Sequence, residues 1–360
     1  MKIDRVNNFD LIRLLAAIQV VLFHSYEHLQ IKAPAFKFLS AFFLEFFPGV
    51  AIFFFISGFL IYASFDRNKQ YLKKYFKNRV LRIFPALWIC LIITIILLVL
   101  DFPGKWNNFF EQSHIIEWFF AQSSLFQFYT PDELRYWGVG TPNGSLWTIT
   151  VEFQFYLVIP FLYYFINKFK NSLIPLALIL IVSIAVNFYI GTIPNEYLTR
   201  KLGAVFVLPY LYYFLIGVGF YIHWNKIKTL FENTFLKWFI LYLVFMYITK
   251  SWLDFDTASY WIKSPLNIIA SLLLAGVTFS AAFTKGTISS RILKGNDISY
   301  GIYIYHMLVV NFMVERGLEG NTIYIFIVLL MTIILATFSW KFIEKPALSF
   351  KKVKPHKNSN

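Results

Sequence analysis

The stretch FDLIRLLAAIQVVLFH, residues 9–24, decides the fold class, because it is apolar yet carries Arg13 near one end and His24 at the other. Across all 360 residues, 58% are hydrophobic and only 14% are charged. A soluble domain carries about a quarter charged residues, so this composition is typical of an integral membrane protein. The first apolar segment is too long for a signal peptide and contains Arg13 and Glu27, so we predict a retained first helix.

The rest of the chain repeats the apolar pattern. A membrane-spanning helix needs about 20 mostly apolar residues. An open sheet cannot satisfy its backbone in lipid, and no alternation typical of barrel strands is visible. We therefore predict an all-α fold, a polytopic transmembrane bundle of about 10 helices. The predicted spans are 9–29, 46–64, 83–101, 148–167, 172–191, 203–222, 236–253, 265–283, 298–314 and 322–342.

The basic residues predict the topology. If the N-terminus lies in the cytoplasm, the inner loops and tails hold most of the 33 Lys and Arg residues. This bias follows the positive-inside rule and places both termini in the cytoplasm. The net charge of +14 is then explained by topology and by contact with anionic membrane lipid. No nucleic-acid partner is expected.

The domain organisation is simple. We expect one transmembrane domain, residues 1–345, followed by a short basic tail, residues 346–360, that is predicted to be disordered. The long outer connection, residues 102–146, is rich in Trp and Phe. Part of it, around residues 115–129, is predicted to form an interfacial or re-entrant helix.

Helical geometry relates the two ionisable residues of the opening stretch. The eleven steps from Arg13 to His24 make three turns plus about 20°, so both side chains share one face, roughly 16 Å apart along the axis. Asp10 lies one turn before Arg13, and Glu27 lies one turn after His24. Because ionisable residues inside a membrane normally face a polar cavity, we predict that Arg13 and His24 open into one shared aqueous chamber.

Plainer interpretations of the same stripe stay open. Arg13 and Asp10 lie near the inner interface, where a long side chain snorkels and a paired charge is ordinary. His24 could be a packing residue that is hydrogen-bonded across helices. The periodicity alone does not choose between a packing role and a catalytic one.

Six stretches carry a resemblance to a known family. The first helix, with ten residues between Arg13 and His24, resembles the signature of the acyltransferase 3 family, membrane enzymes that acylate cell-envelope carbohydrates. Phe153 departs from the pattern, because many members have an acidic residue there. The other matching stretches are FFFISGFLIY (53–62), KNRVLRIFPAL (77–87), NGSLWTITVEFQFYL (143–157), ISYGIYIYH (298–306) and FIEKPAL (342–348).

The resemblance implies an integral membrane O-acyltransferase of the cell (inner) membrane. It would transfer an acyl group, most often acetyl, from cytoplasmic acyl-CoA to a hydroxyl of an envelope polysaccharide or lipid-linked glycan. We assign His24 as the general base, because the pKa of histidine lies nearest neutrality. Glu152 and Glu27 are candidates to hold the His24 tautomer or bind the acceptor. Their plainer interpretations are a helix-starting acid for Glu152 and an exposed interface residue for Glu27.

The donor calls for cations at the inner end of the bundle. Guanidinium and ammonium groups bind the phosphates of coenzyme A, and the resemblance places Arg79 and Arg82 in the family's Arg-x-x-Arg arrangement. Arg13, deeper in the membrane, would contact the inner end of the donor. Lys73 and Lys74 are further candidates, although the same run also fits a generic positive-inside loop.

Four more residues are candidates to line the cavity: Asp10, Ser57, Tyr303 and His306. For His306 two interpretations stay open. It is either a second proton carrier or a packing residue satisfied by Tyr303 or Ser299 across a helix contact.

A second function class also fits the sequence. A transporter or flippase for the same glycan would need a bundle with intramembrane charges and an aromatic outer loop. No metal is expected: His24 and His28 have a metal-compatible spacing, but no third ligand follows at a defined interval.

Overall fold

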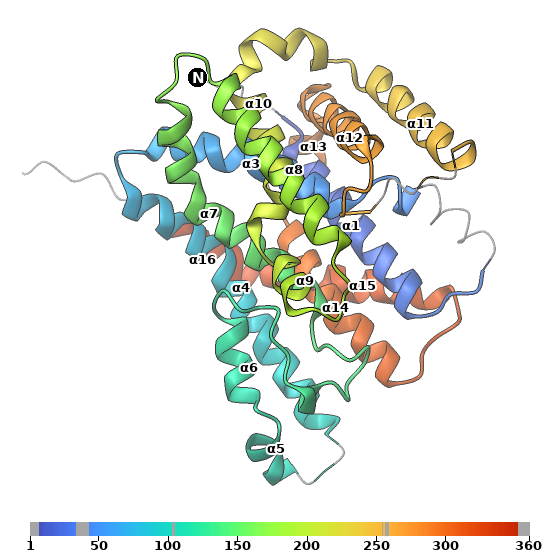
Figure 1. Ribbon diagram of the computed structural model, residues 1–360. Helices are drawn as coiled ribbons and strands as arrows, with labels where there is room; N and C mark the ends of the chain where they lie inside the picture. Colours follow the sequence, from blue (N-terminus) through green and yellow to red (C-terminus); the bar gives the residue numbers. More distant parts are fainter. Residues whose placement is uncertain are drawn as a thin grey trace, which may run out of the picture.

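The computed structural model of the protein describes residues 7–33, 43–102, 104, 106–253, 255 and 259–351. Every regular element in these ranges is a helix, which confirms the predicted all-α class (Figure 1). The elements are α1 Phe9–His28, α3 Gly49–Asn68, α4 Leu72–Leu100, α5 Trp106–Gln112, α6 Ile115–Gln122, η2 Asp132–Leu134, η3 Gly144–Leu146, α7 Trp147–Ile166, α8 Leu173–Thr192, α9 Leu198–Gly203, α10 Val207–Phe231, α11 Phe235–Ser251, α12 Pro265–Phe283, α13 Ile288–Leu293, α14 Ser299–Glu315, α15 Ile323–Ser339, the π-helix η4 Trp340–Glu344 and α16 Lys345–Ser349.

The predicted spans correspond to these helices. Within the described residues, eight helical stretches are long and apolar enough to cross a membrane. The predictions for residues 236–253 and 298–314 correspond to α11 and α14, which have 17 residues each. The largest difference is at α4, which begins at Leu72 rather than at residue 83. A hydropathy window finds only the apolar part of this helix, whereas the backbone continues helical through the basic turns before it.

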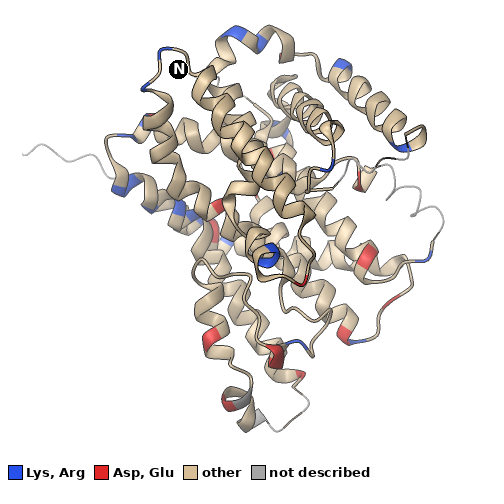
Figure 2. Ribbon diagram, in the orientation of Figure 1, with Lys and Arg blue, Asp and Glu red and all other residues tan. Residues whose placement is uncertain are grey.

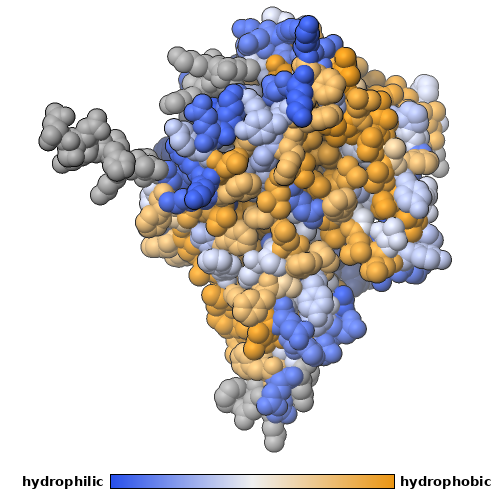
Figure 3. Space-filling model, turned by 60° about the vertical axis from the view of Figure 1, so that its left-hand side comes forward, coloured by the Kyte–Doolittle hydropathy of each residue, from blue (hydrophilic) through white to orange (hydrophobic). Residues whose placement is uncertain are grey.

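The surface fits a lipid environment. Figure 3 shows a broad hydrophobic band with hydrophilic residues above it and below it. Large apolar side chains are exposed within the membrane helices, among them Phe161 on α7, which is 77% exposed. Because soluble monomers rarely expose apolar patches of this extent, the protein is a multi-pass membrane protein.

The two ends of the bundle differ in charge. We define the basic face as the end at which α1, α4 and α14 begin, and the loop face as the end that carries residues 101–137. Figure 2 shows Lys and Arg gathered mainly at the basic face, around the start of α4, while Asp and Glu lie mostly at the other end. That the basic face lies in the cytoplasm stays a prediction.

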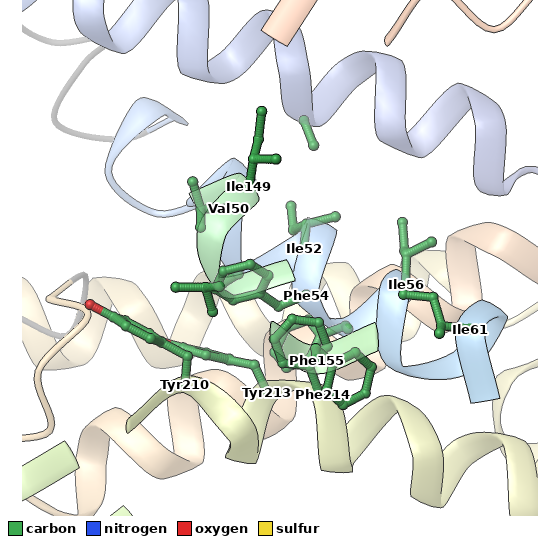
Figure 4. Packing of buried hydrophobic residues seen from close by; sticks show 14 of the residues in the cluster. Val50, Ile52, Phe54, Ile56, Ile61, Ile149, Phe155, Tyr210, Tyr213 and Phe214 are labelled. Atoms are coloured by element: carbon green, nitrogen blue, oxygen red, sulfur yellow. The ribbon is translucent and has the colours of Figure 1, made fainter. Parts of the chain in front are cut away.

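Close helix contacts hold the centre together. At the crossing of α3 and α10, a methyl group at Gly58 would collide with the backbone of Phe214, and one at Gly217 with the backbone of Phe55. Small residues allow the two backbones to approach closely. In lipid the hydrophobic effect does not drive helices together, so the dispersion contacts formed by this approach stabilise the helix pair. Beside it, the ring of Phe214 stacks on Phe155 with centroids 3.8 Å apart and on Phe54 at 4.6 Å (Figure 4).

One irregular segment before α7 enters the bundle. The side-chain amide of Asn143 donates to Ile304 O at 2.8 Å, and that of Asn311 donates to Thr141 O at 2.9 Å. These bonds hold residues 141–146 along α14, where buried backbone groups need partners. The region predicted as an interfacial or re-entrant helix, around residues 115–129, contains the short helix α6, and how this helix lies relative to the membrane stays a prediction. The segment that enters the bundle therefore lies further along the chain, directly before Trp147.

The C-terminal end of the described chain lies at the predicted boundary between domain and tail. The predicted tail begins inside α16, which is helical up to Ser349. Residues 352–360 lie outside the described residues, so the boundary between domain and tail stays a prediction.

Candidate active site

Helices α1 and α14 form the spine of the site. Arg13 Nη2 lies 3.4 Å from Asp297 Oδ2, just before α14 begins. Further along, His24 Nδ1 lies 2.8 Å from His306 Nε2. Because both contacts advance in the same chain direction, the two helices run parallel. The shared face that the periodicity of α1 predicts is therefore the face that packs on α14.

The first cavity lies toward the basic face and is here named the arginine cavity. It has a volume of about 120 Å³ and is lined by Arg13 from α1, Arg79 and Arg82 from α4, and Glu152 from α7, among others. Ser57 and Tyr303, two predicted cavity residues, also line it. Arg79 and Arg82 are three residues apart on a helix, so they share one face.

A buried carboxylate organises two of the three arginines. Arg82 Nη2 donates to Asp297 Oδ2 at 2.5 Å, and Arg13 reaches the same oxygen. Burial alone would raise the pKa of Asp297, but the guanidinium groups of Arg13 and Arg82 and a hydrogen bond from Ser299 hold this pKa well below its usual range. The sequence analysis missed Asp297. Its signal is its place directly before the ISYGIYIYH stretch.

The arginine cavity keeps unused donors. Arg79 Nη2 donates to Ser64 Oγ at 3.1 Å, and its guanidinium lies 5.6 Å from the ring centre of Tyr156. Within the described residues, the buried Nε atoms of Arg13 and Arg79 have no hydrogen-bond partner. A buried donor that is left unpaired costs about 1–3 kcal/mol, so an anion in this cavity would be stabilised.

Glu152 belongs to the arginine cavity. Its Oε1 accepts hydrogen bonds from Tyr156 OH at 2.6 Å and from Ser57 Oγ at 3.1 Å. The prediction that Glu152 holds the His24 tautomer or binds the acceptor stays a prediction.

The second cavity lies toward the loop face and is here named the histidine cavity. It has a volume of about 520 Å³. Its lining includes His24, Trp147, Tyr260 and Trp261, together with Leu44, Glu45 and Pro48 from the segment before α3. The indole of Trp261 is covered on one side by the guanidinium of Arg200, 3.8 Å from the ring centre. None of these aromatic residues was predicted as a site residue: Tyr260 and Trp261 lie together in the connection between α11 and α12, and Trp147 begins α7.

The two histidines form a directed chain. A carbonyl oxygen only accepts hydrogen bonds, so Nδ1 of His306 carries the proton of its 2.6 Å contact with Tyr303 O. With both rings neutral, Nε2 of His306 then accepts from Nδ1 of His24. This leaves Nε2 of His24 unprotonated, which is the form that a general base requires. His306 contacts both Tyr303 and His24, and its interpretation as a second proton carrier or as a packing residue stays open.

Arg13 and His24 line two adjoining cavities, and whether these open into one shared chamber stays a prediction. Arg13 lines the arginine cavity and His24 lines the histidine cavity, and the two cavities share Val50 and Tyr303 as wall residues. The hydroxyl of Tyr303 is held by Thr148 Oγ1 at 2.6 Å and donates to Ser145 O at 3.1 Å. The segment that enters the bundle thus fixes the tyrosine between the cavities, a tertiary contact that helix periodicity does not reveal.

The remaining predicted residues lie around this pair of cavities. Asp10 pairs with Arg13 on the same helix. Glu27 is exposed and is not among the described residues that line either cavity. Lys73 and Lys74 line a separate hollow on the basic face. The ring of His28 stacks on His24 with centroids 5.7 Å apart, yet no described group of His, Cys, Asp and Glu could hold a metal ion.

The two adjoining cavities thus differ in character: one is cationic, and the other contains an oriented histidine. The family model described as "Acyltransferase domain" matches residues 6–341. The chain therefore belongs to the acyltransferase 3 family and is an acyltransferase enzyme, the first of the two function classes that the sequence left open.

Curated relatives cover most of the chain. It is 31% identical over 357 residues to "Nodulation protein 10" of Rhizobium leguminosarum bv. viciae, covering 96% of this chain and 94% of that protein. It is 27% identical over 362 residues to the "O-acetyl transferase" of Shigella phage Sf6, covering 95% and 96%. To the "Peptidoglycan O-acetyltransferase OatA" of Listeria monocytogenes it is 25% identical over 325 residues, covering 83% of this chain and 51% of that protein. No solved structure matches significantly.

Proposed function

We propose that the protein transfers an acetyl group from acetyl-CoA, as the donor substrate, to a hydroxyl of a cell-envelope polysaccharide or its lipid-linked precursor. The observation that carries this proposal is the meeting of the arginine cavity and the histidine cavity at Tyr303. The printed names of the phage and Listeria relatives, both O-acetyltransferases, support the acetyl group and the glycan class.

The donor fits the arginine cavity by charge. Arg13, Arg79 and Arg82 line it, and the Nε atoms of Arg13 and Arg79 offer buried N–H groups without a partner among the described residues. Guanidinium forks bind phosphate oxygens with two parallel hydrogen bonds, which suits the pyrophosphate of the donor. From there the uncharged pantetheine arm would extend between Ser57 and Tyr303, toward the wall that both cavities share.

The acceptor fits the histidine cavity by shape and polarity. Trp147, Tyr260 and Trp261 present aromatic rings around a cavity of about 520 Å³ that contains His24. Aromatic faces pack against the apolar C–H faces of a sugar ring while polar groups orient its hydroxyls. The cavity therefore supplies both the platform and the base for an uncharged acceptor.

The reaction follows from the orientation of His24. The acceptor oxygen attacks the thioester carbonyl carbon, a C–O bond forms as the C–S bond breaks, and the hydroxyl proton passes to Nε2 of His24. The same proton then leaves with the sulfur as the coenzyme A thiol. His306 acts as a positioning residue, because its contact with Tyr303 O fixes which nitrogen of His24 is unprotonated.

The face assignments complete the proposal. Acyl-CoA is a cytoplasmic donor, so the arginine cavity requires the basic face to lie in the cytoplasm, as the positive-inside rule expects. The protein would then act in the cell (inner) membrane and acetylate an acceptor that enters from the loop face.

The direct test uses labelled acetyl-CoA. Inverted membrane vesicles that contain the protein and its native glycans should transfer the label to glycan, and vesicles with His24→Ala should not. Mass spectrometry of envelope glycans with and without the gene identifies the acetylated sugar. Label that reaches glycan at the parental rate in the His24→Ala vesicles would rule out His24 as the base.

A further inference from the structure

A second hollow lies on the basic face, here named the lysine hollow. It has a volume of about 680 Å³, and its walls come from the first turns of α4 and from the segment that follows α16. Its lining residues are Gln70, Tyr71, Leu72, Lys73, Lys74, Lys77, Asn78, Phe350 and Lys351. This size falls within the range of ligand-binding pockets, about 300–1,000 Å³.

The charge of the lysine hollow is unbalanced. Four lysines line it, and none of the described lining residues is acidic. The surface of the hollow is mostly apolar, so the lysines line it with their aliphatic stems, and an anion that binds there would be complementary to the positive charges that these stems carry.

The lysine hollow adjoins the arginine cavity. Burial lowers the pKa of Lys351 to about 7, and the positive charges of Arg79, Arg82 and Arg13 contribute to the same shift. Lys351 therefore lies within electrostatic range of all three arginines of the first cavity. The two sites also take their lining from consecutive turns of α4, since Asn78 lines the lysine hollow and Arg79 lines the arginine cavity.

The lysine hollow also offers aromatic surface. Tyr71 is 63% exposed and Phe350 is 67% exposed, and both line it at the polar end of the molecule. Exposed aromatic side chains provide a face on which a flat heterocycle stacks. The chemistry of the lysine hollow thus matches a phosphorylated nucleoside better than a simple anion.

We propose that the lysine hollow binds the 3′-phosphorylated adenosine end of the donor, and that Lys351 contacts its 3′-phosphate. This proposal rests on the proposed function, because it extends the same donor outward from the arginine cavity. The chain's C-terminal segment then forms part of the donor site. An anionic lipid headgroup would need only a flat basic surface, whereas Phe350 and Lys351 give this hollow a second wall beside α4.

The test compares two donors that differ by one phosphate. Purified full-length protein in nanodiscs of zwitterionic lipid is assayed with acetyl-CoA and with acetyl-3′-dephospho-CoA. We expect a lower KM for acetyl-CoA in the parental protein. Lys351→Ala should raise the KM for acetyl-CoA about tenfold, the effect of losing a charged hydrogen bond, and leave the KM for the dephospho donor unchanged. Lys351→Arg should restore most of the difference.

A matched control and a binding assay complete the design. Lys294→Ala removes an exposed lysine beyond α13 that is not among the lining residues of the lysine hollow, and it should change neither KM. Adenosine 3′,5′-bisphosphate should compete with acetyl-CoA more weakly in Lys351→Ala than in the parental protein.

The outcomes separate the two proposals. If the parental protein transfers acetyl from both donors with equal KM, or if Lys351→Ala raises both KM values equally, the assignment of the lysine hollow is overturned while the proposed function stands. An effect of Lys351→Ala that appears only in nanodiscs of anionic lipid would assign the hollow to a headgroup. If neither donor supports transfer, both proposals fall.

Discussion

The arginine cavity and the histidine cavity bind their substrates by different means. The first is small, about 120 Å³, and its cations are held by the buried carboxylate of Asp297. The second is larger, about 520 Å³, and combines aromatic rings with an oriented histidine pair. Charged groups inside a membrane cost free energy, so their concentration around the first cavity is consistent with a charged ligand there. A neutral sugar needs stacking surface and one base.

The largest effect is expected at the reacting end. His24→Ala should lower kcat by about 10²–10⁴-fold, the usual contribution of a positioned base, without raising the KM for acetyl-CoA. The measurement is the rate of label transfer at saturating concentrations of both substrates. His223→Ala removes a histidine of α10 that is not among the lining residues of either cavity, and it should keep the parental rate. A His24→Ala rate within a few-fold of parental would remove the chemical role from the histidine cavity.

The next effect concerns the orientation of that base. His306→Phe keeps an aromatic ring but removes the acceptor for the proton on Nδ1 of His24. We expect kcat to fall about 10–100-fold with both KM values unchanged, because supporting hydrogen bonds contribute effects of this size. His306→Gln, which can still accept a hydrogen bond, should recover part of the rate. Equal loss in the two variants would indicate a packing role only.

The two arginines of α4 sharpen the comparison on the donor side. Arg79→Ala should raise the KM for acetyl-CoA about 10–100-fold, since a hydrogen bond to a charged group contributes about 1.5–3 kcal/mol. Its protein partner is the neutral Ser64 hydroxyl, so the fold should tolerate the change. Arg82→Ala removes a charge partner of buried Asp297 and should destabilise the protein by about 3–5 kcal/mol. Thermal unfolding in detergent distinguishes the two variants.

The smallest effect is expected at the aromatic platform. Trp261→Ala should raise the KM for the acceptor about 2–10-fold, since an aromatic contact contributes about 0.5–1.5 kcal/mol beyond its buried area. The KM for acetyl-CoA should not change, because Trp261 lines only the histidine cavity. Trp252→Ala, a change at an exposed tryptophan beyond α11, is the matched control. An equal rise in both KM values would mean that the two cavities act as one.

The sequence predicts which residues share one face of α1, but it does not predict which residues pack against that face. The 100° arithmetic places Arg13 and His24 on one face of α1, and both side chains contact the α14 region there. The partners of that face come from residues almost 300 positions away, so periodicity within α1 could not name Asp297. Asp297 was detectable only as an acidic residue beside a matching motif.

The division into two cavities was beyond the sequence for a related reason. Tyr303 lines both cavities, and Ser145 and Thr148, around the start of α7, hold its hydroxyl. Those contacts depend on an irregular segment that enters the bundle, and hydropathy windows detect only regular apolar helices. The same limit explains Glu152, whose position on α7 was predicted but whose side chain faces the arginine cavity.

Sidedness tests the two-cavity account most directly. The protein is reconstituted in sealed proteoliposomes of known orientation, with acetyl-CoA and a glycan acceptor supplied on the same face or on opposite faces. The account predicts transfer only when acetyl-CoA meets the basic face and the acceptor meets the loop face. Equal rates with both substrates on the basic face would contradict it, because the acceptor would then reach His24 without using the histidine cavity's own opening.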